Sequence, residues 1–359
     1  MKKIVSIFLC MMYMVSMVAC GVTQTAGDSA EDSNEKSDGT KLQVVEETEA
    51  APKSITLVYA EVNPLDTIAG QTAKAFKEKV EELSNGTILI DVQHSAVLGS
   101  EYEVLESMLE NNGTIDLARI SAFALTNYGG EKSKLLSLPY TFADREHFWK
   151  FATSDLAAEF LLEPHENGSG VRGLFYGEEG FRHFFAAEPI NGIEDLKGKR
   201  IRVSEDPVMM ALVECLEATP TEVPFGDLYT AFSLDEVDAA EQPITNYQSN
   251  AFDEVAGNVI LDGHTLGAIQ VIITDTAWDR LTAEQQDALM QAGAYASEVN
   301  RTISEQMEAE VLTELREAGC TVVEVSDNAP WKNAVESLVT EQTAGMEELY
   351  QQILDMQAE

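Results

Sequence analysis

The spacing of apolar residues changes several times after residue 53, and each spacing predicts a different element. Residues 54–60 (SITLVYA) are mostly apolar and predict a buried strand. From about 66 to 83 the apolar residues recur at helical intervals and predict an amphipathic helix. Ser-Asn-Gly at 84–86 ends this helix, and TILIDVQ at 87–93 predicts a second strand.

The same alternation continues through most of the chain. A helix is predicted near 101–110, and strands near 115–121, 171–176, 200–203 and 239–242. The stretch 282–359 is mostly helical by its pattern, with one strand near 319–325. Strands that alternate with helices of this length predict parallel β/α units. Ligands bind beyond the carboxyl ends of such strands, which points to the loops near Asn63, 98–101 and 121–123.

The first residues have the pattern of an export signal. Lys2 and Lys3 precede an uncharged apolar run over 4–19, which is short for a membrane-spanning helix of about 20 residues. Residues 17–21 (MVACG) resemble a bacterial lipobox, with methionine where leucine is usual. The resemblance predicts a lipoprotein signal peptide over 1–19 and acylation of Cys20; a plain signal peptide with a chance cysteine is the alternative.

A polar and acidic segment separates this leader from the first predicted strand. Residues 20–53 contain no aromatic residue and no helical apolar stripe. Such a segment buries too little apolar surface to fold, so we expect a disordered acidic linker. It would tether the folded part of the chain to the membrane.

The charge of the chain restricts its partners. Its 359 residues include 62 acidic and 23 basic ones, which gives a formal net charge of −39 at pH 7. Such a surface repels phosphate backbones, so nucleic acid is not an expected partner. Salt screens this field beyond about 8–10 Å, so a local arginine site can still bind an anion.

No catalytic or metal-binding motif stands out. The five histidines are scattered, and no HExxH, GxSxG, GxGxxG or Walker-type run occurs. Cys215 and Cys320 belong to no CxxC or Cys/His cluster; free thiols are favoured, with a disulfide between the two as the alternative. We predict no catalytic residue, cofactor or metal. A lipid-anchored hydrolase, with catalytic residues far apart in the sequence, stays as an alternative.

Seven segments between Ser54 and about Gln291 carry a family likeness. They are AVLGSEYEVLESM (96–108), LSLPYTF (136–142), GLFYGEEGFRHF (173–184), INGIEDLKGKRIRV (190–203), PFGDLYTAF (224–232), VDAAEQP (237–243) and TDTAWDRLTAEQQDAL (274–289). None is specific alone, but in this order they resemble the DctP-type solute-binding proteins of TRAP (tripartite ATP-independent periplasmic) transporters. The chain departs from the family pattern at Glu217 and Ala239, where glycine is usual.

The resemblance implies an α/β fold, a two-domain periplasmic-binding-protein-like clamshell with a hinge and a long helix that spans both domains. We expect 54–179 with about 268–307 to form domain I, and 180–267 with about 308–359 to form domain II. The family implies an extracytoplasmic protein that captures a small carboxylate, such as a C4-dicarboxylate or a sugar acid, and delivers it to the transporter's integral membrane subunits; the lipobox-like sequence adds the lipid anchor at Cys20. The alternatives are a ligand sensor for a membrane receptor and the binding protein of an ATP-driven transporter.

Arginine and amide residues of the second half are the main candidates for the binding site. Arg202 ends the predicted strand 200–203, and its guanidinium offers two parallel donors that match a planar carboxylate. The family resemblance implies this role for the arginine at this position. Arg182 occupies a second arginine position used near the ligand, with pairing to Glu178 or Glu179 as an equal alternative. Gln242 stands where asparagine is usual, and its amide can donate to and accept from a ligand.

Aromatic, acidic and loop residues complete the expected site. Phe225 and Tyr229 can form a wall of the cleft, although aromatic residues at helical spacing more often belong to a core. Glu205 can orient Arg202 or contact a ligand hydroxyl, or it can serve as an acid at the start of the predicted helix 207–217. The loops of the first half add Asn63, Glu101 and Ser121, where polar side chains are also often simply solvated.

Overall fold

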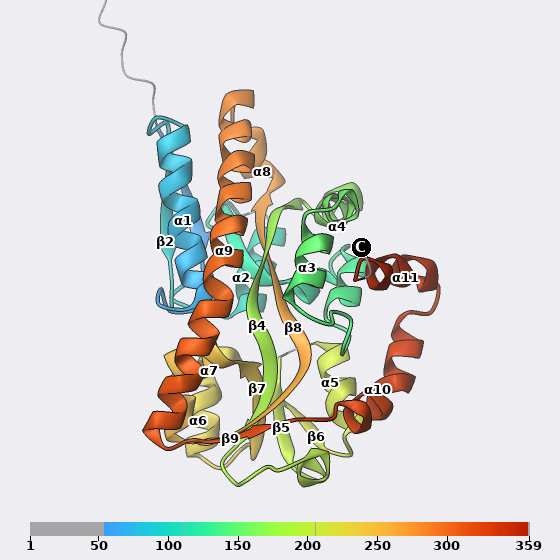
Figure 1. The fold of residues 1–359 in the computed structure, drawn as a ribbon. Helices are drawn as coiled ribbons and strands as arrows, with labels where there is room; N and C mark the ends of the chain where they lie inside the picture. Colours follow the sequence, from blue (N-terminus) through green and yellow to red (C-terminus); the bar gives the residue numbers. More distant parts are fainter. Residues whose placement is uncertain (1–53, 111, 205, 358–359) are drawn as a thin grey trace, which may run out of the picture. The chain divides into compact units, whose positions relative to one another are not determined.

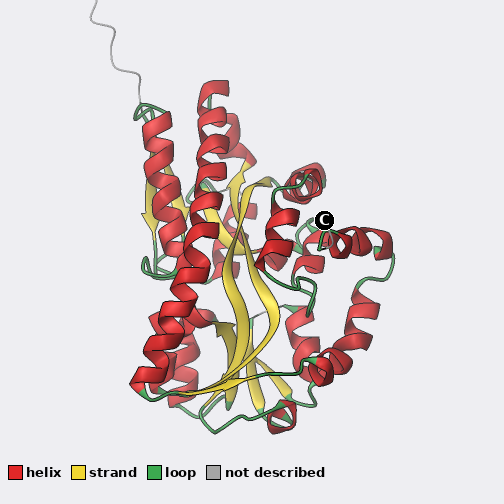
Figure 2. Cartoon of the chain, in the orientation of Figure 1, coloured by secondary structure: helices red, strands yellow, loops and turns green. Residues whose placement is uncertain are grey.

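A mixed β-sheet runs through the computed structural model, which describes residues 54–110, 112–204 and 206–357 (Figures 1 and 2). The strands lie in the order β2-β1-β3-β8-β4-β7-β5-β6, and β9 pairs with β8. Their bounds are β1 (Ile55–Ala60), β2 (Ile88–Gln93), β3 (Leu117–Ser121), β4 (Val171–Ala186), β5 (Arg200–Val203), β6 (Thr219–Glu222), β7 (Ala239–Pro243), β8 (Asn258–Thr274) and β9 (Thr321–Glu324).

Helices pack on both sides of this sheet (Figure 2). Those of the first part of the chain are α1 (Ile68–Leu83), α2 (Glu101–Leu109), α3 (Arg145–Ala152) and α4 (Asp155–Glu166). Those of the second part are α5 (Pro207–Cys215), α6 (Leu228–Ser233), α7 (Ile244–Ser249), α8 (Asp275–Asp279), α9 (Ala283–Ala318), α10 (Ala329–Gln342) and α11 (Glu347–Asp355). Helices α1 and α9 lie side by side in Figure 1.

The sheet has two halves, each built on a group of parallel strands. In one half β1 pairs in parallel with β2 and β3, and in the other β5 pairs in parallel with β6 and β7. The long antiparallel strands β4 and β8 run through both halves and join them (Figure 1). Apolar side chains fill each half separately, around Leu57 and Phe76 in the first and around Ile201 and Leu212 in the second. The fold is therefore α/β with two lobes that share their central strands.

Helix α9 also extends along both halves (Figure 1). It begins with a capping box between Thr282 and Gln285 and ends at Gly319, whose φ of 94° suits glycine. Its 36 residues give a length of about 54 Å at 1.5 Å per residue. This is the long helix that the family resemblance predicted. The boundaries predicted for the two domains stay a prediction.

The C-terminal helix α11 packs back against the first half of the sheet. The Thr141 hydroxyl lies 3.2 Å from that of Tyr350, and the His147 ring lies 2.7 Å from the Ile353 carbonyl. Ile353 is fully buried in the apolar cluster around Phe148 and Phe151. The C-terminal segment of α10 and α11, called the C-terminal strap below, therefore connects the second half of the molecule to the first.

Three strands differ from the sequence-based prediction, and one of them is the short β6, which was not predicted. β4 was expected to end at Tyr176 but continues to Ala186, because its later charged residues are buried and paired inside the sheet. β8 was not predicted at all, since Asp262-Gly263 in its middle is typical of a turn. The parallel β/α units predicted from the alternation of elements are confirmed in the groups β1–β3 and β5–β7, whereas β4 and β8 add antiparallel pairs that the alternation did not predict.

Cys215 and Cys320 are free thiols, so the alternative of a disulfide between them is wrong. The predicted signal peptide, Cys20 and the linker lie outside the described residues. Within 54–357, the helices that the structure describes are too short or too polar to cross a membrane.

Candidate ligand-binding site

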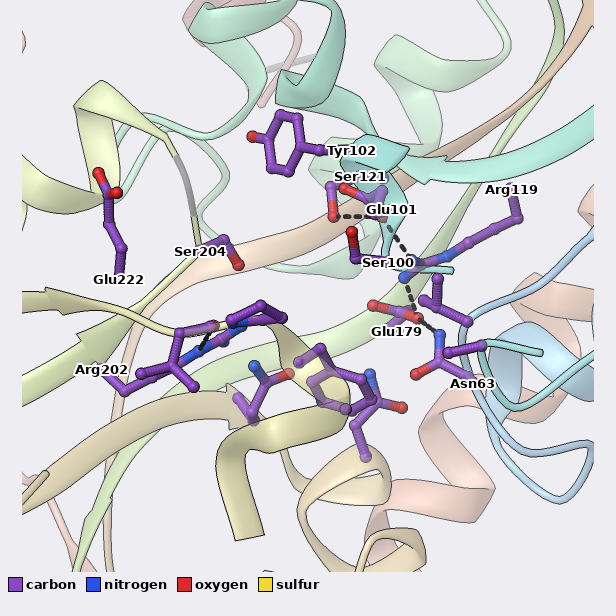
Figure 3. Close-up of a pocket in the computed structure, with 18 of the residues that line it drawn as sticks. Asn63, Ser100, Glu101, Tyr102, Arg119, Ser121, Glu179, Arg202, Ser204 and Glu222 are labelled. Carbon is purple, nitrogen blue, oxygen red and sulfur yellow. Dashed lines mark hydrogen bonds and ion pairs between the residues drawn. The ribbon is translucent and has the colours of Figure 1, made fainter. Parts of the chain in front are cut away.

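A cavity of about 270 Å³ lies where the carboxyl ends of both parallel strand groups come together (Figure 3). One side is formed by the loop after β1, the start of α2 and the end of β3. The other side is formed by the ends of β5 and β7 and by the loop after β6, and the middle of β4 contributes to the lining. This is the position where parallel strands are expected to hold a ligand.

Arg202 reaches the cavity from β5 (Figure 3). The residue is 1% exposed, and its Nε donates to the Val223 carbonyl at 2.8 Å. Its buried Nη1 has no hydrogen-bond partner among the described residues. Burial lowers the pKa of Arg202 to about 10, so it stays a cation at neutral pH. A buried guanidinium nitrogen without a partner costs free energy, so an anion that paired with Arg202 would stabilise it.

Arg119 lies across the cavity, on β3, and its charge is already matched (Figure 3). Its Nη1 donates to Glu101 Oε2 at 3.0 Å, and its Nη2 pairs with Glu179. Glu179 also accepts from the amide of Asn63 at 3.1 Å, and Glu101 accepts from the backbone N–H of Ser121 at 2.9 Å. Burial works against the charge of Arg119, but the surrounding glutamates outweigh it and raise its pKa. The arginine therefore holds the two glutamates in place.

Arg182 belongs to a third, deeper network. Its Nη2 donates to Glu241 Oε1 at 2.8 Å, and its Nε pairs with the other oxygen of the same carboxylate. His264 lies beyond Glu241: one ring nitrogen is 3.5 Å from Glu241 and the other is 2.7 Å from Asp262. Two cations and two carboxylates thus alternate in the interior, which holds Arg182 rigidly at the cavity wall.

The pKa values of this network follow from its charges. Burial raises the pKa of Glu241, but Arg182 and His264 outweigh that effect and lower it to about 2. Burial lowers the pKa of His264, but Asp262 and Glu241 outweigh it and raise it to about 9. Both groups are therefore charged at neutral pH.

The comparisons with known proteins agree with this arrangement. A family model described as bacterial extracellular solute-binding protein, family 7 (DctP), matches residues 59–345. The chain belongs to this family. Its members are solute-binding proteins, and the match covers every residue of the cavity lining.

Individual members resemble this family 7 protein over most of its length. The C4-dicarboxylate-binding periplasmic protein DctP of Rhodobacter capsulatus is 26% identical over 299 residues, which cover 82% of this chain and 89% of that protein. A TRAP periplasmic solute-binding protein of Polaromonas sp. JS666, bound to D-erythronate, has a TM-score of 0.79 and 28% identity, covering 83% of this chain and 98% of that one. One from Xanthobacter autotrophicus Py2, with β-D-galacturonate bound, has a TM-score of 0.78 and 26% identity, covering 83% and 99%.

Most site residues predicted for this family 7 protein lie together. The cavity lining includes Arg202, Arg182, Gln242, Phe225, Ser121, Glu101 and Asn63. The structure places Tyr229 elsewhere: it is outside the lining, 38% exposed, and its hydroxyl donates to Glu254 at 3.0 Å. Glu205 lies outside the described residues. The binding roles of all these residues stay predictions.

The alternative partners proposed for Arg182 are wrong. Glu178 pairs with Arg145 at 2.9 Å, and Glu179 pairs with Arg119, whereas Arg182 pairs with Glu241. Side chains alternate along a strand, so the adjacent glutamates point to opposite faces of β4 and meet different arginines.

Sequence reasoning missed several lining residues of this family 7 protein, above all Arg119 and Glu179. A signal for Arg119 was present, since it is the one charged residue inside the apolar strand LARIS at 117–121. A charged side chain in a buried strand needs a partner, which marks it as structural or functional. Ser204 and Asn246 carried no such signal, because only the folded chain brings them to the cavity.

Proposed function

We propose that this family 7 protein binds a small organic acid in the cavity between the two halves of its sheet and presents it to the membrane subunits of a TRAP transporter. The ligand's carboxylate accepts two hydrogen bonds from the guanidinium of Arg202. Asn63, Glu101, Ser121 and Gln242 contact the rest of the ligand. The protein acts outside the cytoplasm, and it binds its ligand without chemical conversion.

The observation that carries this proposal is the state of Arg202. It lines the cavity, is almost fully buried, and keeps one guanidinium nitrogen without a partner in the described part of the chain. Charge-assisted hydrogen bonds contribute about 1.5–3 kcal/mol each, so a bidentate contact supplies a large part of a micromolar affinity. Relatives named for a C4-dicarboxylate, or solved with erythronate and galacturonate, support an organic acid as the ligand.

We also propose that acylation of Cys20 anchors the protein at the extracytoplasmic face of the membrane. The support is the lipobox-like sequence 17–21 and the acidic stretch that follows it. Several acyl chains on one cysteine give stable anchoring, whereas a single chain is marginal.

Thermal unfolding with a panel of organic acids tests the carboxylate site. A ligand at about 100 times its dissociation constant adds roughly 2.7 kcal/mol of stability, which raises the melting temperature of a folded part of about 300 residues by about 4 °C. In Arg202→Gln we expect this shift to disappear for every acid, because an amide cannot replace the bidentate cation. Without ligand, the variant should melt no lower than the wild type, because it removes a buried unpaired charge.

Arg200→Gln is the matched control on the same strand. Arg200 is half-exposed, pairs with Asp238 at 2.6 Å and does not line the cavity, so its variant should keep the full ligand shift. An Arg202→Gln protein that responds to acids as strongly as the wild type would show that the carboxylate binds elsewhere.

A further inference from the structure

The two ends of the cavity differ in charge, and this difference selects among carboxylate ligands. We infer that the ligand is a polyhydroxylated monocarboxylate and that Glu101 and Glu179 reject a second carboxylate. The inference rests on the proposed function, in which Arg202 binds the first carboxylate. It concerns the far end of the ligand, which the arginine does not touch.

Arg202 is the one cavity arginine without an ion pair among the described residues. Arg119 is paired with Glu101 and Glu179, and Arg182 is paired with Glu241. The charged groups behind Arg182 add no net positive charge, since His264 pairs with Asp262 at 2.7 Å. Glu222 also lines the Arg202 end of the cavity, but this residue is exposed. Among the described residues, Arg202 is therefore the one buried cation of the lining without an ion pair, and it matches one carboxylate.

The opposite end carries an excess of negative charge. Glu101 and Glu179 both pair with the single guanidinium of Arg119, so two carboxylates share one cation. Burial raises the pKa of Glu101, and it raises the pKa of the nearby Glu61 to about 7, so Glu61 is only partly charged at neutral pH. Glu61 is 1% exposed, and its buried Oε2 has no partner among the described residues. A second ligand carboxylate placed here would face like charge in a poorly hydrated site, where screening by salt is weak.

The same end is rich in oxygen atoms that can accept hydrogen bonds. The bonds from Arg119 and Ser121 fall on Oε2 of Glu101 rather than on Oε1. On Glu179, the bonds from Arg119 and from the amide of Asn63 fall on Oε1 rather than on Oε2. Ligand hydroxyl groups can donate to these oxygens, whereas an ionised carboxylate has no hydrogen to donate. Figure 3 shows Glu101, Arg119, Glu179 and Asn63 as one linked group, with Arg202 on the other side.

Matched pairs of acids test this inference by isothermal titration calorimetry on the purified protein. D-Erythronate is compared with meso-tartrate, and D-galactonate with galactarate; within each pair only the terminal hydroxymethyl group is replaced by a carboxylate. We expect the monocarboxylate of the preferred length to bind about 100-fold more tightly than its dicarboxylate partner. In Glu101→Gln and Glu179→Gln we expect this ratio to fall about tenfold, mainly because the dicarboxylate binds more tightly.

Glu106→Gln is the control, because Glu106 is exposed on the same helix as Glu101 and does not line the cavity; it should keep the wild-type ratio. Equal wild-type affinity for both members of a pair, or a ratio unchanged in both cavity variants, would overturn the inference and leave the proposed function intact. Acid binding that survives Arg202→Gln would instead overturn the proposed function. Circular dichroism of each variant confirms that it folds.

Discussion

Three arginines meet at the cavity, and their partners give them different roles. Arg119 and Arg182 are each held by carboxylates, so they shape the wall and fix neighbouring side chains. Arg202 donates to one backbone carbonyl, at 2.8 Å, and has no ion-pair partner among the described residues. In the proposed function, the arginine without a carboxylate partner binds the ligand, so the pairing of the arginines matters more than their number.

The buried histidine next to Arg182 predicts a pH-dependent stability. The folded-state pKa of His264 is raised to about 9, above its unfolded value, so its contribution is complete below about pH 6.5 and is lost as the pH rises through 9. We expect His264→Gln to lose on the order of 2–3 kcal/mol of unfolding free energy at pH 6 and little at pH 9.5. Urea unfolding of wild type and variant across this range measures the difference.

His94→Gln serves as the histidine control, because among the described residues that ring has one hydrogen-bond partner, the hydroxyl of the neighbouring Ser95 at 2.9 Å, and no ion pair. Its unfolding free energy should follow the wild-type pH curve. If His264→Gln ran parallel to the wild type at every pH, the charge of His264 would not contribute to stability.

At the scale of the element, side-chain hydrogen bonds from α9 hold β4 in place at the point where its pairing with β8 becomes irregular. The register between β4 and β8 shifts between Glu178 and Phe181. There the amide of Asn300 binds both backbone groups of Glu178: Oδ1 accepts from the Glu178 N–H at 2.9 Å, and Nδ2 donates to the Glu178 carbonyl at 3.0 Å. Gly177 allows this approach, since a Cβ on it would lie 3.1 Å from the Asn300 side chain. The long helix thus fixes the strand that carries Glu179 and Arg182.

Truncation of Asn300 should therefore be costly. Asn300→Ala leaves two buried backbone groups of Glu178 unpaired, and we expect a loss of about 2–3 kcal/mol in unfolding free energy. The measurement is the midpoint of urea unfolding at unchanged slope. Gln291→Ala, on an exposed face of the same helix, should change the midpoint little. An equal loss in both variants would show that the hydrogen bonds to Glu178 are not the cause.

At the scale of the whole molecule, two lobes share the strands β4 and β8, the helix α9 and the C-terminal strap of α10 and α11 (Figure 1). The cavity lies between groups of strands that belong to different lobes. A ligand that contacts both Arg202 and Glu101 therefore connects the lobes. This arrangement couples binding to the relative position of the lobes, which is what a hinged binding protein requires.

The proposed attachment to the membrane through Cys20 also concerns the whole molecule. We expect Cys20→Ser to move the protein from the membrane fraction to the soluble fraction of cells and to abolish incorporation of labelled fatty acid. Ligand binding by the released protein should be unchanged, because the cavity lies within residues 62–246. Cys10→Ser, in the apolar run of the predicted leader, is the control and should leave the protein on the membrane. A Cys20→Ser protein that stays acylated would overturn the proposed anchor.

The sequence by itself determined the local features. Apolar spacing located β1, α1, β2, α2 and β5 to within a few residues, because burial on one face imposes a period that is readable without the fold. Motif order indicated the family, and it brought Arg202 and Arg182 to attention. Even a departure from the family pattern has a local explanation: Glu217 adopts a φ of 57°, the left-handed conformation for which glycine is usual.

Only the tertiary structure decided how charges are paired. Arg119 meets Glu101 and Glu179, and Arg182 meets Glu241, across separations that no local pattern encodes. β8 escaped prediction because its polar residues, such as Asp262 and His264, are tolerated in the interior only through partners on other strands. The sequence alone does not distinguish an arginine that has a carboxylate partner from one that has none. They become distinct when long-range folding sets which carboxylate lies beside each one.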